Sequence, residues 1–523
     1  MPVHLATAST SHSQNQLGCA VEPVQSARAV TRWDAQTDVL IVGAGAAGAS
    51  AAIEARGLGA EVLILERASD GGGSTALSGG ILYFGGGSEI QTACGFKDDV
   101  EEMFKYLLAA SGPNPDELKV RLYCERNLEH YAWCKAQGLA FKPSFYAKKT
   151  TEPPGDDGLL YSGNENVWPF NEIAKPAPRG HKPRTLGSAG RVVMEALLRQ
   201  TQKLGVRMEA DTRVVGLVSD DEARVVGVIA RKEGQTLAIQ ARRGVILCAG
   251  GFIMNRSMLA AHAPKLLNVN LQIGNPGDDG AGILLGLSAG GSAIGMGEGF
   301  VSVPFYPPSK LVHGVLVNAQ GQRFINEDAY HGRTGEYILR QTAGTAYLIV
   351  DEPSFARPLA GMQLKAAGES IAALERELAL PEGSLVHTIQ FYNDNARRGV
   401  DPLFHKAESY LKPLEQGPFA ALDLSATRAI VPGFTMGGLD TLASGEVLTA
   451  DRRIVSGLYA AGRNSCGLPR SAAGYSSGLS ISCASFFGRQ AGLSAARAEP
   501  KCKRSSRLWA TLVCALTATV AQP

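Results

Sequence analysis

The sequence predicts an α/β protein: a doubly wound domain with a parallel sheet, interrupted by a second, inserted domain. A strand, a glycine-rich turn, a helix and a second strand follow one another over residues 38–67. Two later apolar runs, at 244–251 and 454–463, also end on glycine, as expected of buried strands that approach a ligand. Residues 301–419 lie between these runs and mix strands with charged helices, which indicates an insertion.

The turn in the first unit has the spacing G-x-G-x-x-G that is typical of dinucleotide binding. We expect Gly43 to permit a tight turn, Gly45 to let the backbone approach a pyrophosphate, and Gly48 to bring the helix close to the strand. Unpaired N–H groups at the start of the helix would bind the phosphates. Glu66, at the end of the strand 61–65, is placed to accept ribose hydroxyls. The alternative is a glycine-rich connection that binds no nucleotide.

Length and composition limit the class of protein. A chain of 523 residues with 45% hydrophobic residues can bury a large core and should form at least two domains. A net charge of +2 with 19% charged residues gives no broad basic field for nucleic acid. Nine scattered cysteines without a C-x-x-C pair, and no histidine cluster, favour reduced thiols in a cytoplasmic protein without a metal site.

The two ends of the chain have a different character from the rest. Residues 1–35 are rich in small polar side chains and lack the order of a secretion signal, so we expect a flexible arm. At the other end, a basic cluster at 501–507 precedes an apolar run at 508–521, which is shorter than the ~20 residues of a spanning helix. The tail 498–523 is either a weak membrane contact or an accessory or disordered extension.

The intervening segments can be assigned in order. Glycines and hydroxyls at 71–87 indicate backbone wrapped around a bulky flat ligand, with a plain linker as the alternative. Helices are expected at 97–138, with Asp98 as an N-cap and a second helix at 118–135, and at 189–204. The proline- and aromatic-rich segment 141–185 is a candidate for covering a pocket. The remaining elements are a β-meander at 211–218, 223–231 and 236–240, and a final helix at 476–492.

Three glycine-terminated elements far apart in sequence would converge if one extended ligand lay across the sheet. FAD meets this requirement, with its pyrophosphate at one helix N-terminus and its isoalloxazine near a second. NAD would need only the first unit, and no second fingerprint follows a strand, because the glycine-rich segment 277–282 follows Asn-Pro. The residues expected to bind FAD are Gly43, Gly45, Ala46, Ala47, Gly48, Glu66, Arg67, Gly73, Ser74, Thr75, Ser78, Gly79, Gly80, Val214, Ala249, Gly250, Gly251, Gly462, Arg463, Ser477, Gly478 and Leu479.

Over residues 38–492 the chain resembles the FAD-dependent fumarate reductase and 3-ketosteroid dehydrogenase superfamily. The motifs that carry the resemblance are VGAGAAG (42–48) with Glu66, GGSTALSGG (72–80), CAGGF (248–252), GQRFINED (321–328), TMGG (435–438) and GLYAAGR (457–463). The resemblance implies a glutathione-reductase-like FAD domain at 36–300 and 426–497, and an α+β substrate-capping domain at 301–425. The active site would lie between cap and flavin. The segment GGSTALSGG contains no histidine, where some relatives attach flavin covalently, so FAD should be non-covalent.

Departures from the fumarate reductase branch argue against a dicarboxylate substrate. That branch holds two carboxylates with histidine and arginine and uses an arginine shortly after its N-E dipeptide as proton donor. Here 328–331 follow that dipeptide without an arginine, Gly433 and Phe434 stand where histidine is expected, and Tyr475 stands at the position of another arginine. Two buried carboxylates without cations would cost several kcal/mol.

The resemblance is closer to the 3-ketosteroid branch. Its 4,5-dehydrogenating members have a tyrosine after N-E-D and a Tyr-x-Ser-Gly sequence at the last helix, as at 326–330 and 475–478 here. Its 1,2-dehydrogenating members have glycine four residues after the tyrosine, where Leu479 stands here. The resemblance therefore implies a 3-oxo-5α-steroid 4-dehydrogenase of steroid degradation, with an electron acceptor that the sequence does not identify.

The resemblance assigns three catalytic residues. Tyr475 would donate a hydrogen bond to the 3-oxo group, Ser477 would remove the proton from carbon 4, and Tyr330 would relay it outward. Alternatively the tyrosines are packing residues and Ser477 is only an N-cap or flavin contact. His331 would support the site from behind or be exposed. Rival functions are a 3-ketosteroid 1-dehydrogenase, an enoate reductase of the same fold, and a flavin scaffold without turnover.

Overall fold

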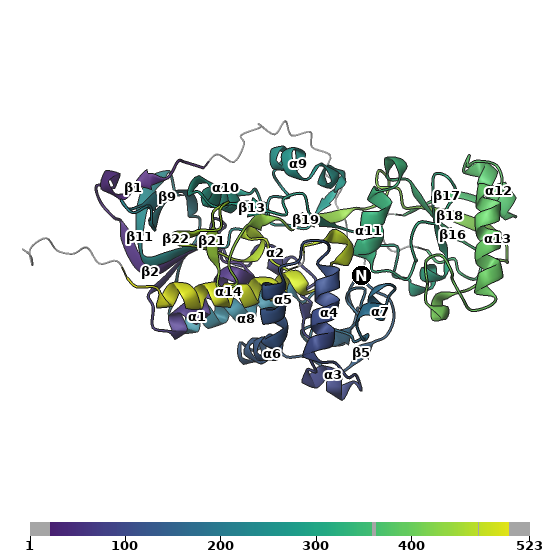
Figure 1. Cartoon of the computed structure of the whole chain (residues 1–523), viewed down its shortest axis with the longest axis horizontal. Helices are drawn as coiled ribbons and strands as arrows, with labels where there is room; N and C mark the ends of the chain where they lie inside the picture. The colour runs from purple at the N-terminus through teal and green to yellow at the C-terminus, as the bar shows by residue number, and fades with distance from the viewer. Residues whose placement is uncertain (1–20, 358–361, 469, 501–523) are drawn as a thin grey trace, which may run out of the picture.

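The structure is a computed structural model that describes residues 21–357, 362–468 and 470–500. The molecule is elongated, with the large mixed sheet at one end and a smaller sheet with α12 and α13 at the other (Figure 1). The tail beyond residue 500 and most of the expected N-terminal arm lie outside the described residues. None of the helices in the described ranges is long and apolar enough to cross a membrane.

The large sheet is built on four parallel strands whose ends lie level. Val42 is in register with both Leu65 and Leu247, and Leu247 is in register with Ala460. The turns that follow these four strands therefore meet at one edge of the sheet, where ligands of doubly wound proteins bind. The strands are β2 (Ala35–Val42), β3 (Val62–Leu65), β11 (Gln235–Leu247) and β22 (Ile454–Ala460), with β8 (Arg207–Glu209) beside β3.

The expected meander is present but is fused to the parallel sheet. Strands 236–240 and 244–251 were expected to be separate, and instead they form the single strand β11. A shift in register between Ala241 and Gly244 accompanies its passage along β2, while its first half pairs with β10 and its second half with β22. The other strands of the sheet are β1 (Gln25–Ser26), β9 (Arg213–Ser219), β10 (Val225–Lys232) and β21 (Glu446–Leu448).

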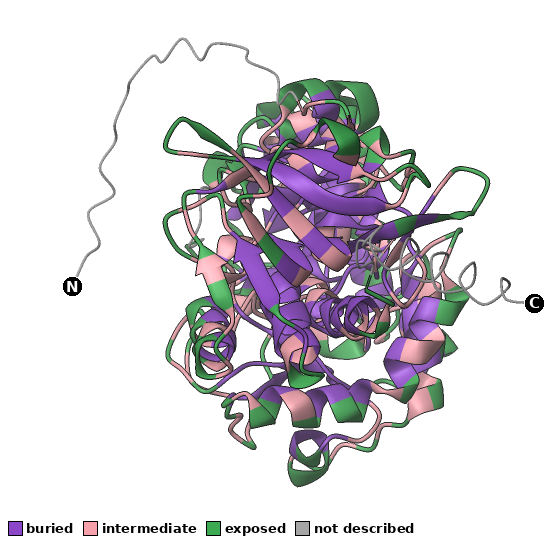
Figure 2. Ribbon diagram, turned by 90° about the vertical axis from the view of Figure 1, so that its left-hand side faces the viewer, coloured by how far each residue is buried: buried purple, intermediate pink, exposed green. Residues whose placement is uncertain are grey.

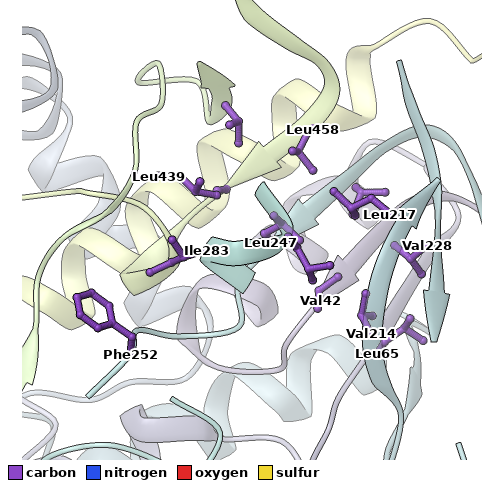
Figure 3. Close-up of a cluster of buried hydrophobic side chains, with 14 of the residues drawn as sticks. Val42, Leu65, Val214, Leu217, Val228, Leu247, Phe252, Ile283, Leu439 and Leu458 are labelled. Atoms are coloured by element: carbon purple, nitrogen blue, oxygen red, sulfur yellow. The ribbon is translucent and has the colours of Figure 1, made fainter. Parts of the chain in front are cut away.

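Apolar residues cover both faces of this sheet. Helices α1 (Ala46–Gly57), α8 (Gly190–Lys203) and α14 (Leu479–Arg497) lie together in Figure 1. Helix α14 packs directly on α1, because a Cβ at Gly488 would lie 2.4 Å from the carbonyl oxygen of Ala47. Figure 3 shows a large apolar cluster that includes Val42, Leu65 and Leu247 of the strands together with Phe252 and Ile283. Figure 2 shows buried strands inside a shell of more exposed helices and loops.

A helical lobe and a small sheet stand between the large sheet and the insertion. The N-cap of α4 is Asp99, whose side chain accepts the N–H of Glu102, so the expectation of Asp98 is wrong. Asp98 is instead buried and pairs with Arg179 at 2.7 Å. The expected helix at 118–135 is two helices with a break at Arg126. The elements are α3 (Glu89–Ala93), α4 (Val100–Ala110), α5 (Glu117–Glu125), α6 (Asn127–Ala136), α7 (Phe170–Ile173), β4 (Leu82–Tyr83), β5 (Phe145–Tyr146), β6 (Leu159–Leu160) and β7 (Gly180–His181).

The insertion is a separate α+β unit. Its antiparallel sheet has the order β15-β16-β18-β17, and helices α12 and α13 pack on the face that carries Val315, Val317 and Ile349. Helix α11 lies where this unit meets the rest of the protein (Figure 1). The predicted fold class, a doubly wound domain with an inserted α+β domain, is confirmed. The bounds are β15 (Val315–Asn318), β16 (Ala346–Val350), β17 (Gln363–Gly368), β18 (Phe419–Asp423), α11 (His331–Leu339), α12 (Ile371–Glu377) and α13 (Ser384–Ala396).

Candidate active site

A cavity of ≈ 800 Å³ runs from the edge of the large sheet to the inserted domain. One end is lined by the turns after β2, β3 and β11, and we call it the nucleotide end. The other end is lined by Phe300, Phe434, Tyr475 and Ser477. Tyr330 does not line the cavity itself but packs behind these residues, with its hydroxyl on Ser477. We call these five residues the slot. The two ends differ in chemistry and are described in turn.

The three fingerprint glycines have distinct surroundings. Gly43 has a φ of +104°, and a Cβ there would lie 2.5 Å from the carbonyl oxygen of Cys248. A Cβ at Gly48 would lie 2.0 Å from the carbonyl oxygen of Gly43, so only glycine lets α1 lie this close to β2. Gly45 lines the cavity, with no atom within 4 Å of a Cβ built on it. Helix α1 begins there without a side-chain cap, which leaves its first N–H groups available for a pyrophosphate.

Glu66 lies at the end of β3 and lines the cavity. Its two carboxylate oxygens accept the backbone N–H groups of Ala44, at 2.7 Å, and Ala68, at 2.8 Å. The side chain therefore holds the fingerprint turn against β3. A carboxylate oxygen can accept more than one hydrogen bond, so the ribose hydroxyls still have acceptors here.

Asp278 ties the cofactor loops together, and sequence reasoning missed it. This buried carboxylate accepts hydrogen bonds from Ser74 Oγ and Arg463 Nη2, each at 2.6 Å. A Cβ at Gly250 would lie only 2.0 Å from Asp278 Oδ1. Two of the glycine-terminated elements that were expected to converge, those that end near Gly250 and Arg463, thus meet on one side chain, together with the loop that carries Ser74. The glycine-rich segment 277–282 does not qualify as a second nucleotide fingerprint, because no strand precedes it. Its two adjacent aspartates are nevertheless the feature of the sequence that could have indicated this contact.

Most of the expected cofactor residues line the cavity. Three do not: Gly48 packs on the fingerprint turn, a Cβ at Gly251 would meet Thr435 Oγ1, and Leu479 is buried in an apolar cluster. Arg67 lines the cavity and pairs with Asp279 at 2.6 Å. The lining residues among those expected are Gly43, Gly45, Ala46, Ala47, Glu66, Arg67, Gly73, Ser74, Thr75, Ser78, Gly79, Gly80, Val214, Ala249, Gly250, Gly462, Arg463, Ser477 and Gly478. The glycine cradle, free N–H groups and polar loops fit an extended FAD.

In the slot, the structure brings together the three residues expected to be catalytic. The hydroxyl of Tyr330 lies 2.6 Å from Ser477 Oγ. Tyr330 immediately precedes α11 of the inserted domain, whereas Ser477 precedes α14 of the large domain. The rings of Tyr330 and Tyr475 are 6.5 Å apart between centroids. The N-cap of α14 is Gly478, so the alternative of Ser477 as that helix's N-cap is wrong.

Both phenols are neutral hydrogen-bond donors at ordinary pH. Burial raises the pKa of Tyr330 well above its usual value, the neighbouring Tyr475 raises it further, and the hydrogen bond with Ser477 only partly opposes this. Burial likewise raises the pKa of Tyr475, against an opposing contribution from Ser480. A buried phenol that keeps its proton can stabilise developing negative charge on a carbonyl oxygen.

The walls of the slot are apolar. Phe300 and Phe434 are stacked at 5.0 Å between ring centroids, and Phe300 lies 4.7 Å from the ring of Tyr475. Arg463, whose guanidinium lies 5.4 Å from the ring of Phe434, is already paired with Asp278. This surface suits a flat, hydrophobic molecule with few polar atoms.

His331 also lines the cavity, and it is buried rather than exposed. Its Nδ1 lies 2.7 Å from Ser302 Oγ. Burial, together with the positive charge of Lys149, lowers the pKa of His331 to about 3. The imidazole is therefore neutral and offers no charge to a carboxylate substrate.

Arg323 and Glu327, in the GQRFINED motif, form an ion pair at 2.9 Å. Arg323 also pairs with Asp401 at 2.9 Å, and Lys406 lies 3.3 Å from Glu327. All four side chains are buried in the inserted domain, where their charges compensate one another. The charged residues of the GQRFINED motif thus have a structural role inside the inserted domain.

The fold and the cavity define a flavin-dependent oxidoreductase, with a cradle for a dinucleotide facing a slot for a second molecule. The model of the FAD binding domain family matches residues 38–478. The chain therefore belongs to this family, and its cofactor is FAD, as the sequence predicted.

Individual relatives agree with this assignment. The chain is similar to the 3-oxo-5-alpha-steroid 4-dehydrogenase of Comamonas testosteroni, at 29% identity over 82% of this chain and 93% of that protein. It also has 44% sequence identity to 3-ketosteroid-delta4-(5alpha)-dehydrogenase from Rhodococcus jostii RHA1, whose crystal structure was solved in complex with 4-androstene-3,17-dione. That match covers 91% of this chain and 100% of the other, with a TM-score of 0.87. A probable fumarate reductase, Ifc3 of Shewanella frigidimarina, is 26% identical over 88% of this chain and 75% of that protein. The expected superfamily is confirmed.

Proposed function

We propose that this protein is an FAD-dependent 3-oxo-5α-steroid 4-dehydrogenase, which introduces the double bond between carbons 4 and 5. The observation that carries the proposal is the 2.6 Å contact between the Tyr330 hydroxyl and Ser477 Oγ in an aromatic slot that also holds Tyr475. Relatives named for this activity include one with 44% identity over nearly the whole chain. FAD, held by the fingerprint turn and by the loops that Asp278 joins, would supply the acceptor for the hydride that leaves carbon 5.

Tyr475 acts on the 3-oxo group. Its neutral phenol donates a hydrogen bond to the carbonyl oxygen, which gains negative charge as carbon 4 loses a proton. Burial holds this donor in its protonated form. The aromatic rings of Phe300 and Phe434 exclude water and so strengthen the hydrogen bond.

Ser477 and Tyr330 act as a pair on the carbon 4 proton. A serine hydroxyl alone is too weak a base, so its own hydrogen must move away as it accepts the new one. In the 2.6 Å contact, Ser477 can donate that hydrogen to the oxygen of Tyr330. Tyr330 in turn releases its own hydrogen to solvent as a proton, so neither residue ends with a buried charge. The steroid thus loses one proton from carbon 4 and one hydride from carbon 5, and the double bond forms between them.

Two rival functions fit the site less well. A fumarate or enoate reductase needs cations for its substrate, but His331 is neutral, and Arg67 and Arg463 in the cavity wall are both ion-paired. Lys149, whose charge acts on His331, is not among the residues that line the cavity. A 3-ketosteroid 1-dehydrogenase is expected to have glycine at the position of Leu479, whose side chain is 1% exposed in an apolar cluster. Replacement of that leucine by glycine would leave a cavity, so the apolar cluster of this protein is packed for leucine and not for the glycine of the 1-dehydrogenases.

The test is anaerobic mixing of the purified holoenzyme with 5α-androstane-3,17-dione while the flavin absorption band is followed. We expect the band to bleach and one equivalent of the 4-ene product to form. Bleaching with a 1-ene product would favour the 1-dehydrogenase, and bleaching by dithionite alone would favour the scaffold without turnover. We also expect a cytoplasmic protein, since each described cysteine is a free thiol. In the same assay, return of the flavin band after a candidate electron acceptor is added would identify the acceptor.

A further inference from the structure

The segment 162–168, which sequence reasoning treated as part of a pocket cover, joins the large domain to the inserted domain. Val167, at 1% exposure, belongs to the core of the inserted domain together with Val303 and Phe305. The ring of Trp168 stacks on His405 at 4.6 Å. The segment is thus held by the same domain that carries Tyr330.

The same segment is fixed to the residues around Ser477. The carbonyl oxygen of Ser162 accepts the backbone N–H of Ser477 at 2.7 Å. A Cβ at Gly163 would lie 1.9 Å from Ser476 Oγ and 2.7 Å from the Tyr106 hydroxyl, so only glycine fits there. That hydroxyl bonds Ser476 Oγ at 2.8 Å and accepts the backbone N–H of Asn164 at 3.0 Å. The backbone of 162–164 is therefore anchored to the residues around Ser477.

Asn164 connects this anchored backbone to the other half of the pair. Its side-chain oxygen Oδ1 accepts the backbone N–H of Tyr330 at 3.0 Å. Asn164 is fully buried, and its Nδ2 has no hydrogen-bond partner among the described residues. The ring of Tyr330 is held in one orientation by its packing against Phe300 and His331, so a shift of its backbone moves its hydroxyl as well.

We propose that Asn164 is a positioning residue that sets the distance between the Tyr330 hydroxyl and Ser477 Oγ. The two hydroxyls belong to different domains and meet at a distance that tolerates little error. One segment holds the backbone of both, at Ser477 through Ser162 and at Tyr330 through Asn164. A displacement of 1 Å in such a pair can cost on the order of a hundredfold in rate. This inference rests on the proposed function.

The first test compares Asn164→Ala with Asn164→Asp, which keeps an acceptor oxygen, and with Asn166→Ala as a matched control in the same segment. We expect Asn164→Ala to lower kcat roughly ten- to hundredfold with FAD content and KM unchanged. Asn164→Asp should recover part of this loss, and Asn166→Ala should behave like wild type. Equal rates for Asn164→Ala and Asn166→Ala would overturn the proposal, as would a loss confined to KM or FAD content.

The second test separates proton abstraction from hydride transfer. With dithionite-reduced enzyme the flavin cannot take a hydride, so exchange of the carbon 4 hydrogens for solvent deuterium reports proton abstraction by Ser477 and Tyr330, assisted by Tyr475, without hydride transfer. We expect Asn164→Ala to slow this exchange, and the double variant Asn164→Ala/Tyr330→Phe to be no slower than Tyr330→Phe. Additive losses in the double variant would overturn the proposal.

The outcomes also distinguish this inference from the proposed function. If wild-type flavin is not bleached by the steroid, the proposed function fails. If wild type is bleached and the Asn164 variants are not selectively slowed, the positioning role alone fails. Should Asn164→Ala not fold with FAD, Asn164→Ser gives the same comparison, because its hydroxyl is too short to reach the N–H of Tyr330.

Discussion

The two ends of the cavity are built by different means. At the nucleotide end, short turns from one sheet edge supply glycines, backbone N–H groups and the carboxylates of Glu66 and Asp278. In the slot, aromatic side chains from two domains surround three hydroxyl groups. The nucleotide end depends on close backbone packing, whereas the slot depends on the fit between domains. Binding of the cofactor and turnover of the substrate should therefore respond to different substitutions.

The largest expected effect is in the slot. Tyr330→Phe and Ser477→Ala each remove one oxygen of the 2.6 Å pair. We expect flavin reduction by the steroid to slow on the order of a hundredfold or more, with the yellow cofactor retained. Stopped-flow absorbance under anaerobic conditions measures the rate, and the flavin spectrum of the purified variants measures retention. A variant that loses FAD together with activity would contradict the separation of the two ends.

The opposite result is expected at the nucleotide end. Asp278→Asn weakens the buried pair with Arg463 and the link to Ser74. We expect FAD affinity to fall at least tenfold, because a partly buried cation that loses its partner is destabilising and three cofactor loops lose their common contact. The variant saturated with FAD should reduce its flavin at nearly the wild-type rate. Titration of the apoprotein with FAD, followed by stopped-flow of the reloaded enzyme, tests both statements, and unchanged affinity would contradict the role of Asp278.

The sequence predicted the nucleotide end better than the slot for a physical reason. The roles of Gly43, Gly45 and Gly48 depend on neighbours a few residues away, and their spacing is therefore visible in the chain. Asp278 meets Ser74 and Arg463 only after folding, so no local pattern shows the contact. In the slot, Tyr330, Tyr475 and Ser477 were identified by resemblance.

Other positions show the same limit. The contact of Asn164 with Tyr330 joins residues 166 positions apart and could not be read from the sequence. Asp98 and Asp99 are adjacent and both suit an N-cap, and the choice between them was decided by the buried guanidinium of Arg179, which pairs with Asp98. Local patterns thus located the elements, while the long-range contacts that complete the site needed the fold.

A smaller effect concerns pH and stability. The pKa of His331 is about 3 in the folded protein, below its usual value of 6.5. Between these two values the unfolded chain binds the extra proton, so stability falls as pH is lowered from 6.5 towards 3. For this one histidine the loss between pH 6.5 and pH 5 is about 2 kcal/mol.

The matched variant is His331→Gln, which lacks this titration. We expect its Tm, followed by release of flavin fluorescence, to drop less than that of wild type between pH 7 and pH 5, by roughly 1–2 °C. Buried His130 and His181, whose pKa values are also lowered, remain in both proteins and cancel in the comparison. The same drop in both proteins would show that His331 is not held neutral by burial.

The most direct test of the account uses hydrogen isotopes at positions that do not exchange with water. Wild-type holoenzyme is mixed anaerobically with 5α-androstane-3,17-dione that carries deuterium either at carbon 5 or at carbon 1, and flavin bleaching is timed. The account predicts a slower reaction with deuterium at carbon 5 and an unchanged rate with deuterium at carbon 1. A slower reaction with deuterium at carbon 1 alone, or no bleaching by either steroid, would contradict it.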